Sequence, residues 1–146
     1  MFKTFQTDMR AAMKSGDKEK LSTLRMLISA VQYEEVARDT PLEESDYVTI
    51  LQREVKKRNE AAEAFRTGGR EEDALKEERE AVILKAYLPK QMSEAEIREA
   101  IQAVIAEKGL AASKAQMGML MKEMMARFKG KTDGKTVQVL AAEILK

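Results

Sequence analysis

Apolar side chains recur along most of this chain at intervals of three or four residues, the spacing of one face of an α-helix. Glycine, proline and capping residues interrupt the pattern and divide it into segments. The predicted helices span residues 2–14, 18–38, 44–67, 70–88, 94–108, 113–128 and 134–145. No alternating run of β-branched and aromatic residues predicts a strand. We therefore expect an all-α fold.

The apolar rows predict which face of each helix is buried. In segment 18–38 the row contains Leu21, Leu24, Leu27, Ile28 and Val31, widened by Tyr33 and Val36. In segment 70–88 it contains Leu75, Val82, Ile83, Ala86 and Tyr87. Arg58 and Arg79 also lie in buried rows. Long basic side chains commonly pack their stems on apolar surface, so we expect both guanidinium groups to stay in water; a functional role is the alternative.

A methionine-rich row follows in segment 113–128, where Met117, Leu120, Met121, Met124 and Phe128 share one face. Such a row can form an adaptable binding groove. The width of the row fits the core of a three-helix bundle better. We expect a second capping box, at residues 113–116, to open this helix.

The stretch around Pro89 ends one helix and starts the next within a few residues. Pro89 has no amide hydrogen and disfavours a helical Leu88. Ser93 and Glu96 form the pattern of a capping box, flanked by Met92 and Ile97 as a hydrophobic staple. We interpret this stretch as a boundary between a four-helix N-terminal unit, residues 1–90, and a three-helix C-terminal bundle, residues 91–146.

Composition limits the chemistry. The 146 residues include no cysteine and no histidine, which excludes disulfides, thiol catalysis, imidazole acid-base chemistry and the usual zinc ligands. The serines are better explained as caps and turn residues, and the paired acids as a solvated face. We expect no catalytic residue, metal site or cofactor. No apolar signal segment opens the chain and no long apolar run is present, so we expect a cytoplasmic protein without a membrane span.

Charge is unevenly distributed. Residues 108–146 contain eight basic and three acidic residues, a net charge of +5, whereas residues 1–107 carry a net charge of −4. This asymmetry indicates that the C-terminal part meets a polyanion. The candidate nucleic-acid-binding residues are Lys114, Lys122, Lys129, Lys131 and Lys135. A secondary basic patch comprises Arg53, Lys56, Lys57 and Arg58.

The kind of contact can also be anticipated. Phe128 is the only aromatic residue beyond Tyr87, and its spacing predicts that it is buried. Base stacking is therefore not expected, and RNA would be contacted through its shape and backbone. An ordinary lysine-rich surface remains the alternative.

Several motifs resemble the YqeY family, also called GatB/YqeY-domain proteins. The stretch YLPKQMS at residues 87–93 is similar to the characteristic seam of that family. Further similarity lies at residues 24–30, 53–60, 65, 69–70, 117–118 and 129–134. Gln116 departs from the family, which more often has an acid there, and the departure concerns capping.

The resemblance implies a C-terminal part similar to the GatB tail domain of the tRNA-dependent amidotransferase, where the tail helps to hold tRNA. The associated label is carbon-nitrogen ligase with glutamine as amido-N-donor, and we treat it as an analogy of fold. We expect an accessory tRNA-binding module without its own active site. One alternative is an adaptor that docks on an amidotransferase or an aminoacyl-tRNA synthetase through an apolar groove between the two units, and another is an enzyme in its own right.

Overall fold

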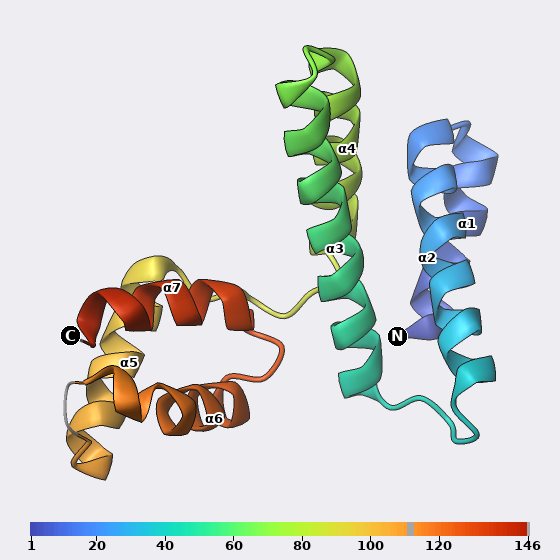
Figure 1. Ribbon diagram of the computed structural model, residues 1–146. Helices are drawn as coiled ribbons and strands as arrows, with labels where there is room; N and C mark the ends of the chain where they lie inside the picture. The colour runs from blue at the N-terminus through green and yellow to red at the C-terminus, as the bar shows by residue number, and fades with distance from the viewer. Residues whose placement is uncertain (111–112, 146) are drawn as a thin grey trace. The chain divides into compact units, whose positions relative to one another are not determined.

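The computed structural model describes residues 1–110 and 113–145, and it is all-α there, as predicted (Figure 1). The helices are α1 (Phe2–Ser15), α2 (Lys18–Ala37), α3 (Glu44–Thr67), α4 (Glu71–Lys85), α5 (Glu94–Lys108), α6 (Met117–Arg127) and α7 (Gly134–Ile144). A short 3-10 turn, η1 (Lys114–Gln116), precedes α6. Within the described ranges no strand occurs, only an isolated bridge between Lys129 and Thr132.

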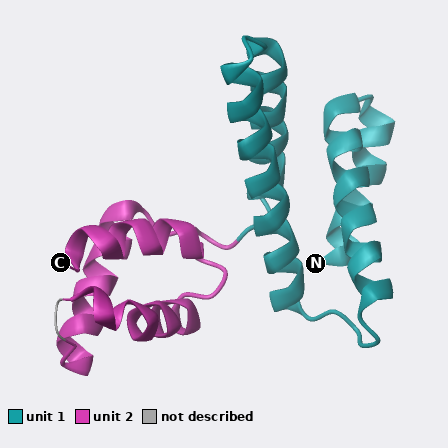
Figure 2. Cartoon of the chain, viewed as in Figure 1, with its two compact units in different colours: residues 1–88 teal, residues 89–146 magenta. Residues whose placement is uncertain are grey.

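The chain divides into two compact units, residues 1–88 and residues 89–146 (Figure 2). Each unit has its own cluster of buried apolar side chains. In neither unit does a described helix have the length and apolar character needed to cross a membrane.

In the first unit, α1 pairs with α2 and α3 pairs with α4 (Figure 1). The α1–α2 turn follows from local sequence: Gly16 adopts a φ of 77° at the end of α1, and the Asp17 side chain accepts a hydrogen bond from the backbone N–H of Lys20. This is the glycine and N-cap combination that ends one helix and starts another. The core joins Phe5, Leu24, Leu27, Ile28, Val31, Ile50, Leu51, Val55, Ala81 and Leu84.

The predicted burial of α2 and α4 was partly wrong. The row from Leu24 to Val31 is buried, but Tyr33 and Val36 are 76% and 88% exposed. In α4, Val82 is 64% exposed, and the buried positions are Ala74, Glu80, Ala81 and Leu84. The Glu80 side chain is buried beside these apolar residues because α3 presents a positively charged partner to that face of α4.

The charged partner is Arg58 of α3. Its Nε lies 3.2 Å from Glu80 Oε2, and its Nη1 lies 3.9 Å from Glu77 Oε2. Its Nη2 approaches the Sδ of Met26 at 3.5 Å. The side chains of Arg58 and Glu80 are only 9% and 7% exposed. The expectation of a solvated guanidinium group was therefore wrong for Arg58.

The expectation of a solvated guanidinium holds for Arg79, whose side chain is 57% exposed and pairs with Glu19 at 2.9 Å. At the end of the first unit, Tyr87 donates a hydrogen bond to the Asp8 carboxylate at 2.5 Å and packs edge-on against Phe5. Burial and, as a smaller effect, the hydrogen bond to Asp8 raise the pKa of Tyr87. The phenol therefore stays neutral and fixes the last residues of the unit to α1.

In the second unit, α5, α6 and α7 contact one another pairwise around a common core. The core contains Ile97, Ile101, Val104, Leu120, Met124, Val137, Leu140, Ala141 and Leu145. Met124 is fully buried, and Met117 and Met121 pack against the cluster. The methionine-rich row is therefore core, as the width of the row predicted.

Two capping predictions were modified by the structure. Ser93 caps α5 by accepting from the N–H of Glu96 at 3.2 Å, but the Glu96 carboxylate accepts from Ser93 Oγ at 3.1 Å, a contact between the two side chains. Ser113 makes no side-chain cap hydrogen bond. The chain there forms η1, so α6 begins later than predicted, at Met117.

We expect Arg58→Met to destabilise the first unit by about 3–5 kcal/mol at pH 8, because it leaves the buried Glu80 without a counter-charge. Burial already raises the pKa of Glu80, and Arg58 opposes that rise. Without Arg58 the pKa of Glu80 rises further. Where a carboxyl group has a raised pKa in the folded state, the folded protein loses stability as the pH rises from the ordinary carboxyl pKa toward the raised value. The deficit should therefore shrink at pH 5. Urea unfolding followed by tyrosine fluorescence measures this, since all three tyrosines lie in residues 1–88.

The matched control is Arg25→Met, since Arg25 is exposed on α2 and should change stability by no more than about 0.5 kcal/mol. Adding Glu80→Gln to Arg58→Met should restore part of the loss. A deficit that is the same at pH 5 and pH 8 would show that Glu80 does not titrate in this environment.

Candidate nucleic-acid interface

The turn between α6 and α7, residues 128–133, forms the centre of the candidate interface, and we call it the lysine turn. The N–H of Lys131 donates to the Phe128 carbonyl at 3.0 Å, and Gly130 adopts a φ of 82°. Asp133 then caps α7 by accepting from the N–H and the hydroxyl of Thr136 at 2.8 and 2.9 Å. The local sequence explains this geometry because glycine tolerates positive φ and aspartate is a preferred N-cap.

The connector, residues 89–92, forms hydrogen bonds with the backbone of the lysine turn. The Gln91 side-chain amide donates to the carbonyl oxygens of Pro89 and Gly130, both at 2.8 Å. The N–H of Met92 donates to the Lys131 carbonyl at 2.9 Å. Two successive carbonyl groups of the lysine turn are therefore bonded to the connector. These contacts hold the backbone of the lysine turn against the connector.

The five candidate lysines are all exposed, and none forms an ion pair with a described residue. The arginines of the same unit behave differently. Arg98 pairs with Glu143 at 2.6 Å, and Arg127 pairs with Glu107 and Glu123, both at 2.8 Å. These hydrogen bonds raise the pKa of Arg127 and lower that of Glu107. The acidic residues thus neutralise arginines and leave the lysines uncompensated.

The five lysines do not all gather at one place. Lys129 and Lys131 lie in the lysine turn, and Lys135 lies in the first turn of α7. Lys122 lies midway along α6, whereas Lys114 lies in η1, before the other end of this 11-residue helix. A helix of that length spans about 16 Å. The structure therefore groups Lys129, Lys131 and Lys135, and places Lys114 apart from them.

The secondary basic patch lies on α3 in the first unit, and its four members differ in their surroundings. Arg58 is buried against Glu80. Arg53 lies 3.7 Å from Glu34, and Lys57 lies 3.5 Å from Glu54. Lys56 is exposed and forms no ion pair with a described residue. The four basic groups are therefore not brought together as one exposed surface.

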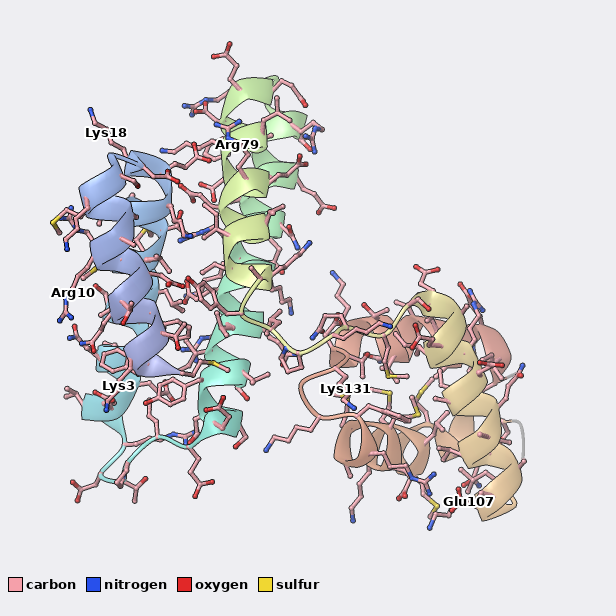
Figure 3. The ribbon with its side chains drawn as sticks, turned by 180° about the vertical axis from the view of Figure 1, so that it is seen from behind. Lys3, Arg10, Lys18, Arg79, Glu107 and Lys131 are labelled. Atoms are coloured by element: carbon pink, nitrogen blue, oxygen red, sulfur yellow. The ribbon has the colours of Figure 1, made fainter. Side chains whose placement is uncertain are left out.

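A pocket of about 250 Å³ lies beside the lysine turn. One of its lining residues, Lys90, was not among the candidates identified from the sequence. Its lining comprises Lys90, Gln91, Met92, Glu96, Phe128 and Lys131. Lys90 is exposed and forms no ion pair with a described residue. Figure 3 shows Lys131 and Glu107 at different ends of the unit, so the carboxylate that pairs with Arg127 is remote from this pocket. Over the described ranges no cluster of three or more acidic residues is arranged to hold a metal ion.

Comparison with known proteins gives relatives of the chain. It matches the YqeY family, described as Yqey-like protein, over residues 2–145. It is 33% identical to an uncharacterized protein of Schizosaccharomyces pombe over 82 residues, which cover 56% of this chain and 67% of that protein. It is 26% identical to the Altered inheritance of mitochondria protein 41, mitochondrial, of Pyrenophora tritici-repentis over 129 residues, which cover 86% of this chain and 70% of that protein.

A protein of the same name from Eremothecium gossypii is 30% identical over 82 residues, which cover 56% of this chain and 45% of that protein. The fold and surface define an all-α protein of two helical units, with a lysine-bearing turn in the second. Since the family match spans nearly the whole chain, the chain belongs to the YqeY family, as its motifs indicated. The word mitochondrial in two of the names describes those relatives.

We expect Gly130→Ala to destabilise the second unit by about 1–2 kcal/mol, because alanine is strained at positive φ. The matched control is Gly118→Ala in α6, where no atom lies within 4 Å of the added methyl group. That substitution should stabilise the unit by about 0.5–1 kcal/mol. Native-state hydrogen exchange of α6 and α7 amides measures both. Equal effects of the two substitutions would contradict the left-handed geometry of the lysine turn.

Proposed function

We propose that this chain is an accessory tRNA-binding module that contacts the phosphate backbone through Lys114, Lys122, Lys129, Lys131 and Lys135. The observation that supports this function is the separation of the two kinds of basic residue in the second unit. Its two arginines are paired with glutamates, while these five lysines are exposed and unpaired among the described residues. Unpaired ammonium groups bind a polyanion without first breaking an intramolecular ion pair.

The overall charge of the unit supports the same function. Residues 89–146 contain ten basic and seven acidic residues, whereas residues 1–88 contain sixteen basic and eighteen acidic residues. A surface rich in lysine neutralises phosphates and releases condensed counterions, which makes binding strongly dependent on salt. Lysine acts as a compact point charge rather than a planar fork, so such a surface reads backbone position more than base identity.

The resemblance to the GatB tail domain of the tRNA-dependent amidotransferase supports tRNA as the polyanion. In that enzyme the tail helps to hold tRNA, and the glutaminase and kinase chemistry lies in other domains. The label of carbon-nitrogen ligase with glutamine as amido-N-donor therefore describes an association of the family, and we assign no amide-forming step to this chain. Phe128 packs against the core of the unit, which favours contacts to the RNA backbone over stacking on its bases.

The second candidate function is a protein-interaction adaptor. It is favoured by an apolar surface on α2, where Met26, Tyr33 and Val36 are 51%, 76% and 88% exposed. Their spacing places them on one side of the helix. An adaptor would use this surface to dock on an amidotransferase or an aminoacyl-tRNA synthetase. Large apolar side chains gathered on one surface are a common feature of docking sites.

Co-purification of the chain with an amidotransferase or an aminoacyl-tRNA synthetase, with and without nuclease, distinguishes the two functions. If the chain is an adaptor, recovery should survive nuclease treatment and fall when Tyr33→Ser and Val36→Ser are combined, because the apolar contact is lost. If tRNA bridges the two proteins, nuclease should abolish recovery and the double variant should retain it. The control is the pair Ser22→Ala and Ser29→Ala, which alters exposed positions of the same helix.

The tRNA-binding function predicts a steep salt dependence. If about five phosphates are contacted, the logarithm of affinity should fall with the logarithm of salt concentration with a slope of about −3.5 to −4.5. Combining Lys129→Glu, Lys131→Glu and Lys135→Glu should reduce affinity at least tenfold at about 0.1 M salt and bring the slope toward about −1.5. A fluorescence-anisotropy titration with bulk tRNA across salt concentrations measures both quantities.

The matched control combines Lys3→Glu, Lys14→Glu and Lys18→Glu, which makes the same charge change at exposed positions of the first unit. It should change affinity much less. Affinity that does not depend on salt, or that is equal in the two triple variants, would overturn the proposed function.

A further inference from the structure

We propose that Lys90 and Lys131 together form a single phosphate-binding subsite on the tRNA-binding surface of this chain. Gln91 is the positioning residue that holds the two lysine-bearing segments together. This inference rests on the proposed function and adds to it a binding residue, Lys90, and a defined place for one phosphate. Lys90 and Lys131 line the same pocket of about 250 Å³ although they are distant in sequence. Both are exposed, and neither forms an ion pair with a described residue.

The positioning role follows from the contacts of Gln91. Lys90 precedes Gln91 directly, and the Gln91 amide donates to the carbonyl of Gly130, the residue directly before Lys131, at 2.8 Å. The N–H of Met92 donates to the carbonyl of Lys131 itself at 2.9 Å. The two lysines are thus attached to backbone segments that are hydrogen-bonded to each other. Binding then requires less ordering of the backbone, which preserves affinity.

The pocket also explains why the anion is expected on its rim. Its apolar lining consists of Met92 and Phe128, which offer no polar partner for a phosphate. The charged residues of the lining are Lys90, Lys131 and Glu96. A phosphate bound by Lys90 and Lys131 is therefore repelled by Glu96. The same carboxylate supplies a test in which a substitution increases affinity.

The first measurement counts phosphates. Lys90→Ala and Lys131→Ala should each reduce affinity for bulk tRNA roughly threefold at about 0.1 M salt. If the two lysines share one phosphate, the double variant should lower the salt slope by about one, whereas two independent contacts would lower it by about two. The matched control is Lys108→Ala, an exposed lysine at the end of α5 that should change affinity less than about twofold.

The second measurement tests Gln91. Gln91→Leu removes both hydrogen bonds of the side-chain amide, and affinity should fall roughly threefold. In this background Lys90→Ala should have almost no further effect, because Lys90 is no longer held beside Lys131. A loss of stability alone would leave the effect of Lys90→Ala unchanged. Circular dichroism checks that the helices of the variant are intact.

The third measurement holds even where Gln91→Leu fails to fold. Glu96→Gln keeps a capping residue that can still bond Ser93, and it removes the repelling charge. It should raise tRNA affinity roughly twofold or more. Glu99→Gln removes one charge at an exposed position of the same helix and should change affinity less.

The outcomes separate the two proposals. If wild-type affinity has the expected salt slope but Lys90→Ala equals Lys108→Ala, or Glu96→Gln equals Glu99→Gln, the subsite is overturned and the tRNA-binding function stands. A double variant that lowers the slope by two also overturns the shared phosphate. If wild-type affinity does not depend on salt, both proposals fall together.

Discussion

The arrangement of the lysine turn depends on its hydrogen bonds with the connector. The backbone N–H of Met92 and the side-chain amide of Gln91 bond the carbonyls of Lys131 and Gly130. Buried or partly buried carbonyl groups require such partners, and here the partners come from the segment that begins the unit. Positive φ at Gly130 and the Asp133 cap then complete the turn. The backbone that carries Lys131 is thus held by hydrogen bonds to the connector.

Charge pairing follows a different rule in each unit. In the first unit, Arg58 is buried against Glu80, which is nearly inaccessible, and lies 3.9 Å from the partly exposed Glu77. In the second unit, pairing occurs at the surface, where Arg127 bonds both Glu107 and Glu123. Arginine suits such multiple contacts because its guanidinium group presents several donors in one plane. Lysines remain available for other anions as a result.

The features predicted well from sequence are those with local causes. Gly16 and Asp17 end α1 and start α2 because glycine tolerates positive φ and aspartate caps, and neither effect needs a distant residue. The buried face of α4 was missed because it depends on Arg58 of another helix. The contact of Gln91 with Gly130 joins positions 39 residues apart, so no periodicity indicated it or the place of Lys90 beside Lys131.

The bond between Tyr87 and Asp8 has a consequence for synthesis on the ribosome. It joins the first helix to the final residues of the first unit, 79 positions later. The first unit therefore cannot complete its tertiary structure until Tyr87 has left the exit tunnel. Until then, part of the apolar surface of the nascent helices α1 to α3 stays exposed. The residues that follow the connector must be added before Tyr87 leaves the tunnel, so the rate at which they are translated sets how long that surface stays accessible to chaperones.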